Sequence, residues 1–176
     1  MAAVITVLYP LAIWFGQGKV EPRVLAMLLL LAAAARLPAM KVSLAARWSA
    51  VAALALVGAA LWSNALLPLK LYPVLVNLAF LGAFAWSLAA PPSMVERMAR
   101  LTEPDLPPSG VAYTRVVTQV WCGFFVVNGA IALYTALFSS DAVWSLYNGV
   151  IAYLLMGLLF AGEYLVRIRF KRAHHV

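Results

Sequence analysis

Residues 71–90 read LYPVLVNLAFLGAFAWSLAA, a stretch of twenty residues without a charged side chain. A helix that crosses the hydrocarbon core of a bilayer needs about 20 mostly apolar residues, so this stretch is long enough to span a membrane. It therefore predicts an all-α membrane protein rather than a soluble domain.

The rest of the chain has the same character. Its 176 residues are 65% hydrophobic and 11% charged, whereas soluble domains average roughly 45–50% apolar and about 25% charged residues. We expect a single integral membrane domain over residues 1–176, a polytopic helix bundle with five to six transmembrane segments. The apolar segments cover about residues 2–15, 22–37, 44–66, 71–90, 115–138 and 142–166.

The first apolar segment, residues 2–15, leaves two interpretations open. At about 1.5 Å per residue it reaches roughly 20 Å, which is less than the hydrocarbon thickness of about 30 Å. It either crosses a thinned bilayer or is re-entrant. A removable signal peptide is disfavoured, because no Lys or Arg precedes the segment and no cleavage-like site of small residues follows it.

The connection at residues 91–113 is the only substantial polar one. Ser93 and Glu96 have the spacing of a capping box, which predicts a short helix over about residues 93–102. On that helix Glu96 and Arg100 form an i,i+4 pair. An apolar face opposite this pair indicates an amphipathic helix in the membrane interface, followed by an extended, acidic return to the next span. The apolar face consists of Met94, Val95, Met98 and Leu101.

Lys and Arg residues are distributed unevenly between the two sides of the expected bundle. If the segments alternate, one side receives ten of the thirteen basic residues. Cytoplasmic connections collect positive charge, so we expect this side, with the C-terminus and residues 91–113, to face the cytoplasm. The side on which the N-terminus lies depends on whether residues 2–15 cross the membrane.

Three asparagines stand inside expected spans: Asn77, Asn128 and Asn148. With Tyr147 they would gather in the outer half of the bundle if their helices pack together. One interpretation is a polar cavity open to the outside. The other is that the amides form hydrogen bonds between helices, as polar side chains often do in membranes, and this is the stronger of the two.

Glu163 is the only acidic residue well inside a span, and Arg167 follows it by four residues. A proton-coupled carrier could use such a carboxylate, but an interfacial ion pair explains it equally well. Cys122 has no nearby histidine, and the two histidines stand at the C-terminal tail. We therefore expect no enzyme activity, no catalytic residues, no metal site and no cofactor. The basic residues mark membrane orientation rather than binding of nucleic acid.

Several motifs resemble the bacterial intracellular septation protein A family. They are Leu8-Tyr9-Pro10-Leu11, Lys70-Leu71-Tyr72-Pro73 and Pro92-Ser93-Met94-Val95-Glu96-Arg97-Met98. The chain is also similar to inner-membrane proteins encoded beside fatty-acid-like biosynthesis genes, including aryl polyene clusters. Both resemblances imply a small polytopic inner-membrane protein, and the first implies a link to septation and the cell envelope.

Two functions follow as expectations. The first is a non-enzymatic inner-membrane protein that supports envelope synthesis or septation through contacts with other membrane proteins. The alternative is a small transporter or lipid-handling protein with an outward-facing polar cavity. The expected partners are the lipid bilayer and other inner-membrane proteins. Small-xxx-small spacings such as Ala79 and Ala83 also allow a homo-oligomer.

Overall fold

The computed structural model describes residues 24, 27, 54–55, 58 and 67–174, so the segments expected at 2–15, 22–37 and 44–66 lie outside the described residues, apart from isolated positions. In the described part every regular element is a helix and no strand occurs. The all-α prediction is confirmed for this part of the chain. In chain order the elements are α4 (Leu67–Lys70), α5 (Tyr72–Ala89), α6 (Met94–Ala99), α7 (Pro108–Phe138), α8 (Asp141–Leu146), the π-helical segment η2 (Tyr147–Ile151) and α9 (Ala152–His174).

Within these residues, three helical stretches are long and apolar enough to cross a membrane. They cover Leu67–Ala89, Pro108–Phe138 and Asp141–Phe170, and they correspond to the segments expected at 71–90, 115–138 and 142–166. The total of five to six spans stays a prediction.

The structure corrects the boundaries of the last two spans. The return from residue 103 was expected to be extended up to Tyr113, but α7 already begins at Pro108. Pro107 is extended (φ −66°, ψ 159°), as a residue before proline prefers, and Pro108 occupies the first helical position, where no N–H is needed. At the other end, α9 continues past residue 166 to His174.

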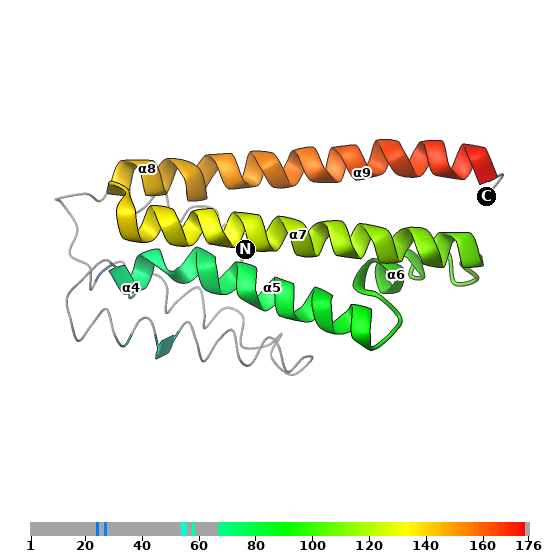
Figure 1. The fold of residues 1–176 in the computed structure, drawn as a ribbon, viewed down its shortest axis with the longest axis horizontal. Helices are drawn as coiled ribbons and strands as arrows, with labels where there is room; N and C mark the ends of the chain where they lie inside the picture. Colours follow the sequence, from blue (N-terminus) through cyan, green and yellow to red (C-terminus); the bar gives the residue numbers. More distant parts are fainter. Residues whose placement is uncertain (1–23, 25–26, 28–53, 56–57, 59–66, 175–176) are drawn as a thin grey trace.

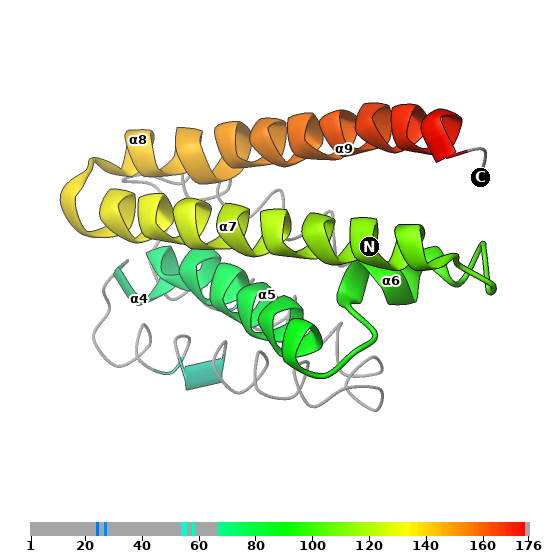
Figure 2. The ribbon, with the colours of Figure 1, turned by 45° about the vertical axis from the view of Figure 1, so that its right-hand side comes forward.

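The three long helices lie side by side, with α7 between α5 and α9 in both views (Figure 1, Figure 2). One end of this bundle carries α4 and the α7–α8 turn, and we call it the hairpin end. The other carries α6 and the C-terminus of α9, and we call it the α6 end (Figure 1). The helices α5, α7 and α9 alternate in direction and are long and apolar enough to cross a membrane, so the two ends would lie at opposite faces of a bilayer that they span.

The core of the described bundle lies on one side of α7, where Val117, Trp121 and Phe125 are buried. The ring centroids of Phe84 and Phe125 are 5.2 Å apart, and those of Trp121 and Phe160 are 4.5 Å apart. Aromatic rings thus bridge α5, α7 and α9. Many other large apolar side chains on these helices are exposed, which suits a surface that faces hydrocarbon.

An ion pair and a tryptophan hold the hairpin end together. Lys70 Nζ lies 3.0 Å from Oδ1 of Asp141, and the Lys70 side chain is only 8% exposed. Trp144, which is fully buried, donates its indole N–H to the carbonyl oxygen of Lys70 at 3.1 Å. These contacts fasten the start of the first described span to the start of the third.

Candidate functional site

The asparagines of the expected polar cluster form a chain of hydrogen bonds across the bundle. Asn77 donates to the carbonyl oxygen of Pro73 at 2.9 Å, and Asn128 donates to Oδ1 of Asn77 at 3.0 Å. Tyr147 donates its hydroxyl to Oδ1 of Asn128 at 2.9 Å. The chain therefore connects α5, α7 and η2, and both amides are buried.

Asn148 belongs to the same region but has other partners. Its Nδ2 donates to the carbonyl oxygen of Trp144 at 2.9 Å and to Oγ1 of Thr135 at 3.3 Å. The structure thus brings Asn77, Asn128 and Tyr147 into one network and places Asn148 beside it. Thr135 was not expected as a partner, although hydroxyl side chains in spans often bond across helices.

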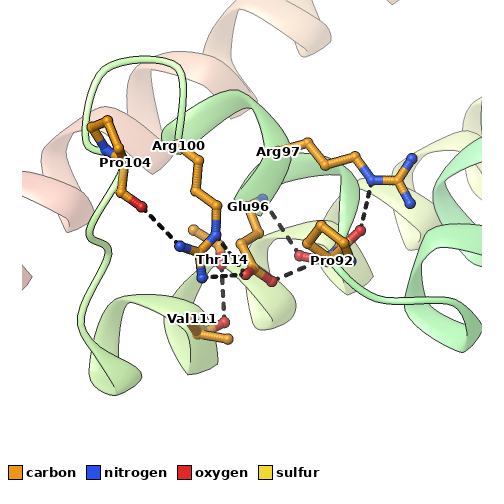
Figure 3. A network of polar contacts seen from close by, with 8 residues as sticks. Pro92, Glu96, Arg97, Arg100, Pro104, Val111 and Thr114 are labelled. Atoms are coloured by element: carbon orange, nitrogen blue, oxygen red, sulfur yellow. Dashed lines mark hydrogen bonds and ion pairs between the residues drawn. The ribbon is translucent and has the colours of Figure 1, made fainter.

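Helix α6 has the expected capping box, in which Ser93 Oγ accepts from the Glu96 N–H and the Glu96 carboxylate accepts from the Ser93 N–H. The Arg100 guanidinium donates to Oε1 of Glu96 at 2.8–2.9 Å and to the carbonyl oxygen of Pro104 at 2.9 Å (Figure 3). Arg97 donates to the carbonyl oxygen of Pro92 (Figure 3). The acidic return is thereby tied to α6.

Two hydroxyl side chains hold α6 against the long helices. The Met94 N–H donates to Ser87 Oγ of α5 at 2.8 Å, and the Val95 N–H donates to Thr118 Oγ1 of α7 at 3.3 Å. These are N–H groups of the first helical turn, which have no partner within the helix itself. Neither hydroxyl was predicted, because its role depends on the position of α6 in space.

Helix α6 buries the charged Glu96 and exposes part of its expected apolar face. Glu96 is buried, whereas Met98 is 58% and Leu101 is 85% exposed. Val95 does pack against the core. The apolar side chains of the segment 93–102 are therefore divided between the bundle and its surface.

Glu163 and Arg167 form an ion pair at the same end of the bundle. Arg167 Nε and Nη2 donate to the two carboxylate oxygens of Glu163 at 2.9 and 2.8 Å. Tyr113 of α7 donates its hydroxyl to Oε1 of Glu163 at 3.2 Å, and its ring stacks on Phe170 at a centroid distance of 4.7 Å. The pair is thus fixed to α7 through Tyr113.

A cavity of about 630 Å³ lies beside this ion pair, between α5, α6, α7 and α9. Its walls are mostly apolar and include Phe84, Met98, Trp121, Phe125 and Phe160, while its polar side chains include Glu103, Glu163 and Arg167. Its size is within the roughly 300–1,000 Å³ of small-molecule sites. None of the three asparagines lines this cavity, so it differs in place and polarity from the cavity considered for the outer half.

Metal-ligating side chains do not cluster in the described part of the chain. No three His, Cys, Asp or Glu side chains gather there as metal ligands would, and Cys122 is a free thiol. The cavity is an apolar chamber whose lining contains one guanidinium and two carboxylates. Such an arrangement suits binding of an amphiphile.

Comparisons of the chain with protein-family models, with curated proteins and with solved structures found no match.

Proposed function

We propose that this chain is a multi-pass protein of the bacterial inner membrane that handles lipids by holding an amphiphile in the cavity at the α6 end. The cavity carries this proposal, because its apolar walls and its charged groups suit the two parts of an amphiphile. The proposed role is non-enzymatic. It is the lipid-handling function expected as the alternative, moved from the asparagines to the opposite end of the bundle.

Two buried tryptophans provide the test. Trp121 is 6% exposed and lines the cavity, whereas Trp144 is fully buried at the hairpin end. The full chain would be reconstituted in vesicles of phosphatidylethanolamine and phosphatidylglycerol that contain a trace of phosphatidylethanolamine with a diazirine in its acyl chain. After illumination, mass spectrometry would locate the lipid adducts.

We expect adducts on Trp121 and Phe125, since both rings are buried and line the cavity. Trp144 should carry none, and the exposed Leu154 provides the reference for labelling from the bulk bilayer. Adducts confined to exposed residues would contradict the proposal. An adduct between a cavity residue and another peptide of this chain would show that the chain itself fills the space, and would contradict it as well.

A second candidate function is support of envelope synthesis or septation through contacts with other membrane proteins. The exposed Met98 and Leu101 of α6 favour it, because such residues next to a membrane surface suit a helix of a partner. A photo-crosslinking residue at Leu101 in living cells should then give a discrete protein adduct. The same residue at Leu158, which is 69% exposed on α9, is the matched control, and equal protein labelling at both positions would argue against a specific contact.

The orientation of the chain in the membrane is part of the same proposal. The α6 end carries Arg97, Arg100, Arg167, Arg169 and Arg172, so the positive-inside tendency puts this end in the cytoplasm. A reporter that is active only in the cytoplasm should work when it is fused after residue 176. If a reporter that is active only in the periplasm worked at this position, the orientation would be the opposite of the one proposed.

A further inference from the structure

The charged part of the cavity lies at the depth of lipid headgroups. Trp144 stands at the hairpin end and Glu163 stands nineteen residues later in the same span, which corresponds to roughly 28 Å along a helix. This distance is close to the hydrocarbon thickness of about 30 Å. A ligand in the cavity therefore has its apolar part at the level of acyl chains and its polar part near Arg167.

The apolar walls alone provide little free energy for an acyl chain to enter the cavity. A lipid tail in the bilayer is already surrounded by hydrocarbon, so moving it next to Phe84 or Trp121 removes no apolar surface from water. Preference for a particular lipid must then come from the charged side chains in the lining of the cavity. The nature of these side chains decides which ligand the cavity selects.

Arg167 is held in place and still has donors to offer. A guanidinium carries five N–H donors, and two of them point to Glu163. Glu163 is in turn held by the Tyr113 hydroxyl and is only 11% exposed, whereas the Arg167 side chain is 45% exposed. The planar guanidinium matches the geometry of phosphate oxygens, and its fixed orientation lowers the entropic cost of binding.

The carboxylates indicate which source of phosphate fits. Glu103 and Glu163 both line the cavity, and Glu163 stands beside Arg167, so a free inorganic anion would meet a carboxylate next to the guanidinium. A phospholipid with an ammonium in its headgroup complements both signs, and its tail occupies the apolar chamber. The charges therefore favour a lipid headgroup over dissolved phosphate.

We propose that the cavity binds a membrane phospholipid, with the acyl chain between α6, α7 and α9 and the headgroup phosphate on Arg167. Glu163 and Tyr113 act as positioning residues for the guanidinium. This inference rests on the proposed lipid-handling function and adds the group by which the lipid is recognised.

The experiment compares two diazirine lipids with the same acyl chains, phosphatidylethanolamine and diacylglycerol, which lacks the phosphate. The readout is the adduct yield on Trp121 of the full chain in vesicles of phosphatidylcholine. We expect phosphatidylethanolamine to label Trp121 at least about tenfold more than diacylglycerol, which is the effect that one charge-assisted hydrogen bond accounts for. Inorganic phosphate added to the buffer should leave this yield unchanged.

Variants test the assigned residue. Arg167→Gln should reduce the phosphatidylethanolamine yield to that of diacylglycerol, and Arg167→Lys should reduce it less, because the charge stays while the planar fork is lost. Arg169→Gln is the matched control, since Arg169 is exposed on the same helix but does not line the cavity. Its yield should equal that of the unchanged protein, which separates a specific site from general attraction of lipids to the basic tail.

The outcomes separate the two proposals. Equal labelling of Trp121 by both lipids would overturn the phosphate assignment and leave the lipid-handling function standing. If Arg167→Gln also abolished labelling of Trp121 by diacylglycerol, the phosphate assignment would be overturned as well. The arginine would then only shape the cavity. Suppression of labelling by inorganic phosphate would overturn the choice of a lipid over a free anion. Failure of both lipids to label Trp121 in the unchanged protein would overturn both proposals.

Discussion

The side-chain amide of Asn128 donates a hydrogen bond of 3.0 Å to Oδ1 of Asn77, and this bond joins α7 to α5 inside the bundle. Asn128 also accepts from the Tyr147 hydroxyl through its own Oδ1. The amide thus uses both its donor and its acceptor for interhelical contacts. Asn128 is the central residue of the network, and its removal takes a hydrogen-bond partner from both Asn77 and Tyr147.

Replacing Asn128 with Leu should lower the free energy of unfolding by about 1–2 kcal/mol, because the buried Asn77 amide and the half-buried Tyr147 hydroxyl each lose a hydrogen bond. Asn77→Leu should cost somewhat less, and the double variant should fall short of the sum by about 0.5–1.5 kcal/mol. Reversible unfolding in mixed micelles measures all three values. Strict additivity of the two single effects would show that the amides do not stabilise each other.

Gly129 lies where α7 approaches Asn77 closely. A Cβ at this position would stand 3.1 Å from Cβ of Asn77, and that atom cannot move without α5. Gly129→Ala should therefore lower the free energy of unfolding by about 1–3 kcal/mol. Gly123→Ala on the same helix is the control, because a Cβ there meets nothing within 4 Å, and it should leave stability unchanged or raise it by up to about 1 kcal/mol.

Asp141→Asn should remove the carboxylate that pairs with the ammonium of Lys70. The Lys70 side chain is only 8% exposed, so its charge would stay buried without a counter-ion. We expect a loss of about 2 kcal/mol in unfolding free energy, less than the about 3–5 kcal/mol of a fully buried pair, because Asp141 is 35% exposed. Adding Lys70→Met should recover part of this loss. Asp105→Asn in the exposed return should change stability by less than about 0.5 kcal/mol, and a comparable loss there would mean that the ion pair is not the cause.

Ser87 and Ser145 are equally buried but differ in their hydrogen bonds. Ser87 donates to the carbonyl oxygen of Phe84 and accepts from the Met94 N–H, whereas Ser145 Oγ has no partner among the described residues. Ser87→Ala should thus destabilise the protein by about 1–2 kcal/mol, and Ser145→Ala should be neutral or stabilising. Thermal unfolding of the two variants in one detergent makes the comparison, which a larger loss for Ser145→Ala would contradict.

For residues 67–174 the fold can be compared directly with the prediction from the sequence. The length of residues 71–90 was enough to predict a span, and the Ser93 and Glu96 spacing was enough to predict where α6 begins. The start of α7 was placed too late, because Pro107 and Pro108 read as part of an extended return, although a proline also suits a first helical turn. Residues 2–15, 22–37 and 44–66 are not tested by these observations.

The site was harder to predict because hydropathy gives the depth of a residue in the membrane but not the direction of its side chain. The depth of Asn77 and Asn128 put them near each other, yet their bond depends on how α5 and α7 are rotated. Local pairs such as Glu163 and Arg167 could be predicted, since a helix itself brings them together. The cavity could not, because it arises where four helices meet at the position of α6.

The π-helical segment η2 has a consequence for the rotational phase of the third described span. It precedes α9, whose Phe160 and Glu163 face α7, and it follows Trp144, which points to Lys70. A π turn holds an extra residue relative to an α-helix, and each residue of an α-helix turns the chain by about 100°. Deleting one residue here would therefore turn either Trp144 away from Lys70 or the cavity end away from α7, so a single irregular turn keeps both ends of the span in phase.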